Sequence, residues 1–221
     1  ELTIGSRLAS FGLLYWQAAP YTRDHPSHGA ILALLERRVV DQAAFWETAP
    51  SGARQGNLRA WAALSGSAVT LASDRNDLSP WAERSLSEVV CTADQDGSLP
   101  QEMSRGALAL HYQLHAVAPL VTAAAILERQ GIAIQDRCDG ALHRVVAFTI
   151  GDVTGDNHAE RITGTPQTLA DAGDQLAGYR LAWVEPYLHL RADAEMEALV
   201  SEMRPLNYTK LGGNQTALWG R

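Results

Sequence analysis

Helical periodicity is the feature of this sequence that most restricts its fold. Apolar residues recur at three- and four-residue spacing through most of the chain, and no segment alternates apolar and polar residues as a half-buried strand would. The spacing predicts helices over residues 27–46, 57–73, 79–93, 104–120, 136–151, 173–190 and 193–203. We therefore predict an all-α fold of about seven or eight helices, arranged as antiparallel pairs in an α/α toroid or a compact bundle.

Capping residues and breakers support these boundaries. Ser27 and Ser79 stand where N-caps are expected, Pro80 fits a first helical position, and Pro186 marks a bend or a first turn. Residues 94–100 and 152–167 are polar and predict loops, and the glycine-bearing tail from residue 205 predicts irregular structure. Neither an internal repeat nor a low-complexity linker divides the chain, so residues 1–221 are expected to form one domain.

The charge balance argues against a nucleic-acid partner. The chain has 18 basic and 25 acidic residues and a formal net charge of −7, whereas phosphate backbones are bound by concentrated positive charge. Lys210 is the single lysine, and the other basic residues are arginines, whose planar fork can grip a carboxylate. A few arginines in a cleft can still bind an anionic ligand locally.

Common catalytic and membrane motifs are missing from the sequence. It contains no glycine-rich phosphate loop, no HExxH and no GxSxG; its two cysteines lack metal-ligand spacing and its seven histidines are scattered, so we predict no metal site. No stretch approaches the roughly 20 apolar residues of a membrane span. Cys91 and Cys138 either pair in an oxidising compartment or remain two buried thiols, and the sequence leaves both open.

One predicted helix carries polar groups that a core helix does not need. Within residues 104–120, Arg105 and Tyr112 are seven positions apart and His115 follows one turn later, so a continuous helix places all three near one side. A cation, a phenol and an imidazole on one stripe suit the lining of a cleft. The structural alternative for Tyr112 is an interhelical hydrogen bond with its ring in the core.

Four segments, in order along the chain, resemble the alginate lyases of polysaccharide lyase family 5. They are GNLRAWAALS (56–65), GSLPQEMSRGALALHYQLHAVAPL (97–120), LAWVEPYL (181–188) and KLGGN (210–214). The resemblance implies an incomplete α/α toroid, β-elimination on an anionic polysaccharide without a cofactor, and periplasmic or secreted residence. Residues 1–55 resemble the family only in helical pattern, and family members begin further upstream, so we expect that N-terminal helices are lacking here.

The resemblance also implies roles for individual residues. Tyr112 would act as base and acid, while Asn57 and Arg105 would neutralise the uronate carboxylate beside the reacting carbon. An unperturbed phenol loses its proton near pH 10, so a phenol that works as a base needs a cation beside it. The implied substrate contacts are Trp183, Glu185, Tyr187 and Lys210.

Leu58 is the main departure from the family pattern, which has a histidine there, and Gln113 stands where the family has another. Leucine neither neutralises a carboxylate nor takes a proton, so His115 is the best candidate for a substitute imidazole. Loss of the opposite-face base would restrict activity to mannuronate-like or glucuronate-like units. We therefore predict a monomeric polyuronate lyase; the alternatives are a non-catalytic polyuronate-binding or structural remnant, and a lyase for another acidic glycan such as glucuronan.

Overall fold

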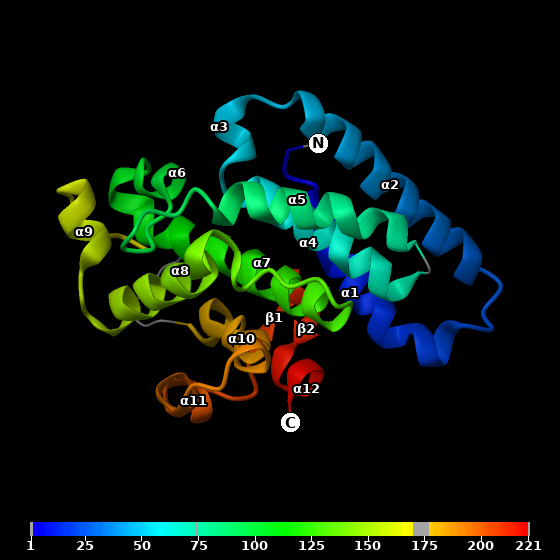
Figure 1. Ribbon diagram of the computed structural model, residues 1–221. Coiled ribbons are helices and arrows are strands. Elements are labelled where there is room, and N and C mark those ends of the chain that lie inside the picture. Colours follow the sequence, from blue (N-terminus) through cyan, green and yellow to red (C-terminus); the bar gives the residue numbers. More distant parts are fainter. Residues whose placement is uncertain (1, 74, 170–176, 221) are drawn as a thin grey trace.

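The computed structural model describes residues 2–73, 75–169 and 177–220, and most of them are helical (Figure 1). The predicted all-α class is confirmed. The longer helices are α1 (Gly5–Thr22), α2 (His28–Thr48), α4 (Asn57–Ala72), α5 (Ser79–Val90), α7 (Ala109–Arg129) and α8 (Arg137–Thr154). The shorter helices are α3 (Ser51–Arg54), α6 (Pro100–Met103), α9 (His158–Thr163), α10 (Val184–Leu190), α11 (Ala194–Ser201) and α12 (Gln215–Trp219). Short 3₁₀ turns are η1 (Asn76–Leu78), η2 (Gly106–Leu108), η3 (Gly178–Leu181) and η4 (Thr209–Leu211).

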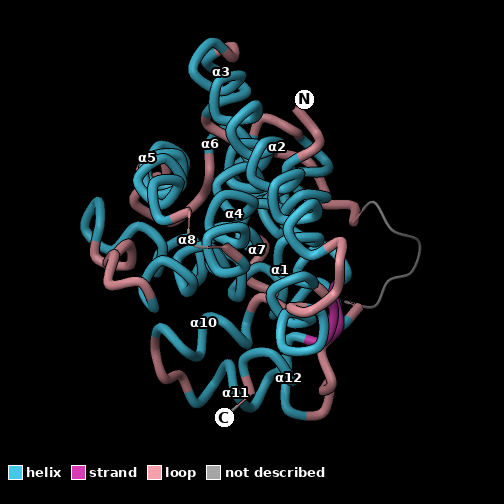
Figure 2. The backbone as a smooth tube through the Cα atoms, turned by 90° about the vertical axis from the view of Figure 1, so that its right-hand side faces the viewer, coloured by secondary structure: helices cyan, strands magenta, loops and turns pink. Residues whose placement is uncertain are grey.

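Helices α4 and α7 form the centre of the molecule, with α1 and α5 packed against α4 and with α8 and α10 packed against α7 (Figure 2). Both central helices are buried on nearly all sides, as expected for helices that are apolar all round. Small residues let α1 approach α4 closely. A Cβ atom at Gly5 would lie 2.8 Å from the backbone nitrogen of Ala62, and one at Gly12 would lie 3.1 Å from the Ala68 Cβ.

The central helix also accounts for the most apolar stretch of the chain. Contrary to the expectation from the sequence, among the described residues the segment Gly106–Arg129 is long and apolar enough to cross a membrane by length and composition. However, 83% of its most apolar window is buried inside the protein. Contacts with neighbouring helices therefore already cover the surface that would otherwise face lipid.

Two predicted helices begin later than the sequence pattern indicates. The segment 104–120 is interrupted, because Gly106 has a left-handed φ of +59° and α7 begins only at Ala109. The predicted helix 173–190 is also shorter: residues 173–176 lie outside the described residues, η3 follows, and α10 begins at Val184. Pro186 lies in the first turn of α10, one of the two places its ring was expected to occupy.

Residues 152–167 were predicted to form a loop, yet they contain the end of α8 and the short helix α9. The buried carboxylate of Asp152 accepts hydrogen bonds from the backbone N–H groups of His158 and Ala159 at the start of α9. A carboxylate at the N-terminus of a helix accepts hydrogen bonds from the free N–H groups there, and its negative charge interacts favourably with the positive end of the helix dipole. The capping residue lies six positions upstream, which explains why a local pattern did not predict this helix.

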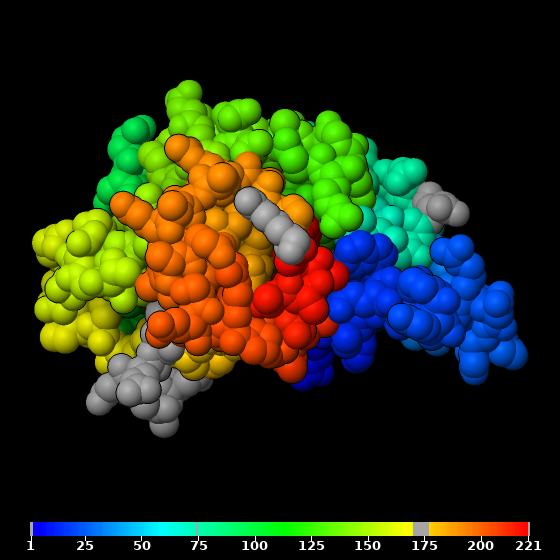
Figure 3. Space-filling model, turned by 90° about the horizontal axis from the view of Figure 1, so that it is seen from below, coloured from blue at the N-terminus to red at the C-terminus, as the bar shows by residue number. Residues whose placement is uncertain are grey.

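The tail is largely irregular, as predicted, but it forms one antiparallel pair of two-residue strands, β1 (Asn207–Tyr208) and β2 (Gly213–Asn214). The turn η4 between them lies against α1, and Figure 3 shows the red end of the chain beside the blue start. Ser10 Oγ donates to the Thr209 carbonyl at 2.7 Å. Gly212, at φ +85°, packs so closely that a Cβ there would lie 2.7 Å from Leu13 Cβ.

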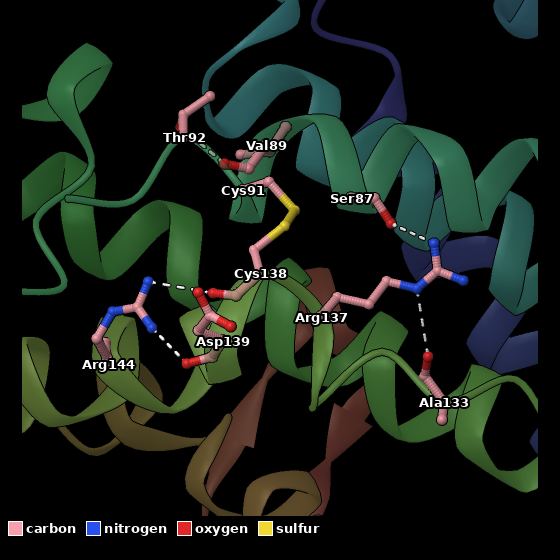
Figure 4. Close-up of a disulfide and its surroundings, with 9 residues drawn as sticks. All are labelled: Ser87, Val89, Cys91, Thr92, Ala133, Arg137, Cys138, Asp139 and Arg144. Carbon is pink, nitrogen blue, oxygen red and sulfur yellow. Dashed lines mark hydrogen bonds between the residues drawn. A yellow bond between two sulfur atoms is a disulfide. The ribbon is translucent and has the colours of Figure 1, made fainter. Parts of the chain in front are cut away.

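A disulfide joins Cys91, after α5, to Cys138 in α8, with the Cα atoms 5.5 Å apart (Figure 4). The sequence had left this pairing open. Cys138, Asp139 and Gly140 all have left-handed backbone angles, with φ of 51°, 58° and 70°. The Arg144 guanidinium donates to the carbonyls of Cys138 and Asp139, which fixes this unusual turn beside the cross-link.

Candidate active site

A cavity of about 390 Å³ opens where α7 meets the last third of the chain. Three segments that are distant in sequence form its walls. The lining residues are His111, Tyr112, Leu114, His115 and Ala118 from α7, Tyr179 and Arg180 from η3, Tyr208 from β1 and Lys210 from η4. The site therefore depends on how η3 and η4 pack onto α7, which no single sequence motif specifies.

The cavity has a positive local character in a protein of net charge −7. Arg180 and Lys210 line it together with two imidazoles and three phenols, and none of the described lining residues is a carboxylate. Clustered cations in a concave site raise the local concentration of anions. Within the described ranges, no three His, Cys, Asp or Glu side chains are placed to hold a metal ion.

The structure brings Arg105 and Tyr112 together, as the sequence stripe predicted. The guanidinium carbon of Arg105 lies 5.0 Å from the centroid of the half-buried Tyr112 ring, within the range of a cation–π contact. Arg105 reaches the ring from the turn between α6 and η2, before α7 begins. Arg105 is exposed and is not among the residues that line the cavity.

His115 lines the cavity as a neutral imidazole. The indole Nε1–H of Trp61 donates to its Nε2 at 3.1 Å. Because an indole can only donate, Nε2 must be the acceptor, which leaves the ring proton on Nδ1. Burial, together with the positive charges of Lys210 and Arg180 and the neighbouring His111, lowers the pKa of His115 to about 3. His115 is therefore a weak base near neutral pH, but its Nδ1–H remains available as a donor.

His111 and Arg180 are two cavity residues that the sequence analysis did not select. The Nη1 atom of the buried Arg180 lies 3.3 Å from Nδ1 of His111. The His111 ring also stacks over that of His115, with centroids 6.4 Å apart and planes 17° apart. Arg180 directly precedes the segment LAWVEPYL, but nothing in the local sequence indicates that it faces α7.

Asn57 lies at the start of α4 and is engaged by a buried carboxylate. Its Nδ2 donates to both oxygens of Glu102, at 3.2 and 3.1 Å, and its backbone N–H donates to the same carboxylate at 2.7 Å. Burial raises the pKa of Glu102, and the hydrogen bonds from Asn57 oppose that rise. Asn57 is not among the cavity-lining residues. The structure thus gives its amide a partner within the protein.

Leu58 and Gln113, the two positions that depart from the family pattern, both contact other parts of the protein. Leu58 is half-buried and packs against an apolar cluster that includes Trp46 and Ala62. Gln113 is fully buried; its Oε1 accepts from the Leu99 backbone N–H at 3.1 Å, and its Nε2 donates to the Gly97 carbonyl at 3.1 Å. Leu58 therefore adds apolar contacts at the start of α4, and Gln113 ties the loop before α6 to α7.

Three of the four expected sugar contacts are core residues in the structure. Trp183 is 0% exposed and Tyr187 is 3% exposed. Glu185 is 4% exposed and accepts from Arg204 Nε at 2.8 Å and from Thr216 Oγ1 at 2.6 Å. All three lie in or directly before α10, which packs against α7 and α12, and none of them lines this cavity. The fourth, Lys210, does line the cavity, with Nζ 6.0 Å from the Trp61 ring centroid.

The fold and the cavity together define a helical protein with a cavity lined by two cations and, among its described lining residues, no carboxylate. The chain belongs to the alginate lyase family, because the family's sequence model matches residues 34–159, more than half of its length. An alginate lyase of Cobetia marina is 27% identical over 218 residues, which is 98% of this chain and 57% of that protein. An alginate lyase of Pseudomonas aeruginosa (strain LESB58) is 31% identical over 162 residues, or 73% of this chain and 43% of that protein.

Solved structures of alginate lyase A1-III share the fold. The crystal structure of the enzyme from Sphingomonas species A1 superposes with a TM-score of 0.81 and 19% identity, covering 98% of this chain and 62% of that one. A complex of an A1-III variant with a tetrasaccharide superposes with a TM-score of 0.80 and 19% identity, covering 99% of this chain and 61% of that one. These structures have an α/α toroid, so the predicted incomplete toroid is confirmed. The chain spans about half the length of the curated relatives it matches.

Proposed function

We propose that this protein cleaves a polyuronate of the mannuronate type found in alginate by β-elimination. The observation that carries the proposal is the composition of the cavity: a phenol, two cations and no carboxylate among its described lining residues. A polyuronate presents one carboxylate per sugar unit, and this lining complements it. The names of the relatives point the same way, since the proteins from Cobetia marina and Pseudomonas aeruginosa are called alginate lyases.

The chemistry requires a neutralised carboxylate before a proton can leave. The C5 proton of a uronate becomes acidic when cations or donors stabilise the enolate-like charge that develops on the adjacent carboxylate. Arg180 and Lys210 line the cavity and supply that charge, and the Nδ1–H of His115 supplies a further donor. Their positions suit a carboxylate between η3, η4 and α7.

Tyr112 is the proton-transfer group in this proposal. The phenolate removes the proton from C5, the C4–O bond breaks as the C4–C5 double bond forms, and the phenol then returns a proton to the leaving oxygen. The Arg105 guanidinium carbon lies 5.0 Å from the centroid of this ring, in a cation–π contact that positions the phenol. One residue can perform both transfers only when the proton and the leaving group lie on the same face of the sugar.

Leu58 limits the stereochemistry that we propose. In place of an imidazole it presents an apolar side chain to an apolar cluster, and His115, with a pKa of about 3, is a weak base. A base for the opposite face is therefore not supplied by either residue. We propose that mannuronate-type units, or glucuronate-type units with the same relation between proton and leaving group, are cleaved and that guluronate units are not.

Residence and assembly belong to the proposal as well. The disulfide between Cys91 and Cys138 supports an oxidising compartment, which favours periplasmic or secreted residence. We propose a monomer that acts on an anionic polysaccharide, with no nucleic-acid or membrane partner and no cofactor.

The proposal is tested by the ultraviolet absorbance of the unsaturated uronate product. Polymannuronate, polyguluronate and glucuronan are offered separately to the wild type and to Tyr112→Phe, with Tyr21→Phe as the matched control because Tyr21 is 90% exposed and lines no part of the cavity. Tyr112→Phe should lower kcat by at least about 100-fold, while the control keeps wild-type activity. Binding of polymannuronate without any absorbance change would instead identify a non-catalytic polyuronate-binding protein.

A further inference from the structure

Trp61 lies on α4, behind the wall of the cavity on α7. Its side chain is 1% exposed and is not among the described lining residues, yet three residues that do line the cavity contact it. The indole Nε1–H donates to His115 Nε2 at 3.1 Å. The Tyr208 ring meets the indole edge to face with centroids 6.2 Å apart, and Lys210 Nζ lies 6.0 Å from the indole ring centroid. Trp61 therefore joins α7, β1 and η4 at one place.

The hydrogen bond between Trp61 and His115 has only one possible direction. An indole N–H donates and cannot accept, so Nε2 of the imidazole accepts and the ring proton resides on Nδ1. Among the described residues, none accepts a hydrogen bond from this Nδ1. The partner of one ring nitrogen decides what the other can offer. Trp61 thus determines that His115 offers an N–H, rather than a lone pair, to a ligand in the cavity.

The tautomer matters for a reaction in which negative charge develops. Burial, followed by the nearby charges of Lys210 and Arg180, lowers the pKa of His115 to about 3, so the ring is neutral near pH 7 and has a single proton to place. An N–H stabilises the enolate-like charge on a uronate carboxylate, whereas a lone pair repels it. A donor whose interaction strengthens as this charge develops acts mainly on kcat.

We propose that Trp61 is a positioning residue for the β-elimination, which acts by holding His115 in the tautomer that donates from Nδ1 to the substrate carboxylate. The inference rests on the proposed function, because it takes a uronate as the ligand of this cavity. Since the indole is buried, water does not compete for its N–H, and the tautomer is set before a substrate binds.

Trp61→Phe is the variant that tests this role. Phenylalanine keeps an aromatic ring beside Tyr208 and Lys210 and removes only the donor. Trp219→Phe is the matched control, because Trp219 is 2% exposed, donates its own indole N–H to Gln215 Oε1 at 3.1 Å and does not line the cavity on α7. Both variants therefore lose a buried indole donor, and only one of them loses it at the site.

Long-range proton–nitrogen NMR spectra report which ring nitrogen of His115 carries the proton, and His115→Phe identifies its signals. The wild type should show the Nδ1–H tautomer, and Trp61→Phe should shift it to Nε2–H or to a mixture. On polymannuronate, Trp61→Phe should lower kcat about ten-fold, the loss of one hydrogen bond to a charged group, with little change in KM. Trp219→Phe should change neither the tautomer nor kcat. In a His115→Phe background, Trp61→Phe should cost no further activity, because both replacements remove the same donor.

The outcomes separate this inference from the function on which it rests. An Nε2–H tautomer in the wild type, or a tautomer that Trp61→Phe leaves unchanged, would overturn the positioning role. A tautomer shift without a fall in kcat would also overturn it, as would equal losses in Trp61→Phe and Trp219→Phe or a further loss in the His115→Phe background. These results leave the polyuronate function standing. If the wild type releases no unsaturated product from any of the three polymers, the proposed function fails and the positioning role fails with it, whatever the spectra show.

Discussion

Replacing Cys91 and Cys138 together by serine removes a cross-link between residues that are 47 positions apart in the sequence. Closing a loop of that length in the unfolded chain corresponds to about 4 kcal/mol of stabilisation of the folded state. For a chain of this size that loss lowers the Tm by roughly 8 to 16 °C. Both half-cystines are exposed, so serine leaves no buried cavity or unsatisfied hydroxyl.

The backbone beside the cross-link reduces this loss. Cys138 and Asp139 are non-glycine residues in the left-handed region, with φ of 51° and 58°, and each costs roughly 1 to 2 kcal/mol in that conformation. Without the disulfide this turn is free to relax toward ordinary angles, held only by the hydrogen bonds from Arg144. Because those hydrogen bonds keep part of the turn in place, we expect about half of this conformational cost to be released and a net loss of about 2 to 3 kcal/mol.

Urea unfolding followed by far-ultraviolet circular dichroism measures this change in the absence of a reductant. Asp139→Gly is the matched variant, because it keeps the disulfide and removes a side chain from a left-handed position; it should stabilise the protein by about 1 kcal/mol. Wild-type protein reduced with dithiothreitol should resemble the double-serine variant. A double-serine variant within about 0.5 kcal/mol of the oxidised wild type would refute the loop-closure reasoning.

Three further perturbations test other parts of the structure. Arg204→Met removes the guanidinium from Glu185, which is 4% exposed, and urea unfolding should show a loss of about 3 kcal/mol, because a buried carboxylate is left without its cation. Gly97→Ala places a Cβ 2.0 Å from the Arg144 carbonyl oxygen at a φ of +92°, and its Tm should fall by several degrees or more. His115 has a folded pKa of about 3 and an unfolded pKa near 6.5, so the unfolded chain binds the proton first as the pH falls. Its stabilising contribution is present above about pH 6.5 and is lost between about pH 6.5 and 3, and thermal melts of His115→Gln should show a shallower fall over that range.

The all-α class was predictable because a helix that buries one face needs apolar residues at three- and four-residue spacing, and this spacing can be read directly from the sequence. The contact between Arg105 and Tyr112 was also predicted, but from a continuous helix that does not exist. Gly106 adopts a φ of +59° and interrupts the segment before α7 begins at Ala109. The contact survives because the preceding turn folds back over the first turn of α7. Apolar spacing reports which face is buried, and it does not report where a backbone leaves the helical region.

The site was less predictable than the fold, because its residues come from separate segments. Trp183 and Tyr187 lie within a segment that resembles the family, yet α10 turns both into the core. Arg180, only three residues before Trp183, faces the cavity with His111. Whether one of these side chains faces the cavity or the core depends on how η3 and α10 pack against α7. A local sequence pattern does not contain this information.

On the proposed function, the engagement of Asn57 by Glu102 and the apolar surroundings of Leu58 leave carboxylate recognition to residues away from the start of α4. We expect recognition to depend instead on Arg180 and Lys210, which η3 and η4 bring to the face of α7. Ser10 and Gln17 hold η4 against α1, and these contacts therefore hold the backbone of Lys210 at the cavity on α7. On the proposed function, we expect a site assembled this way to bind a polyanion without an imidazole at position 58, so affinity and turnover should be separable in the Tyr112→Phe variant.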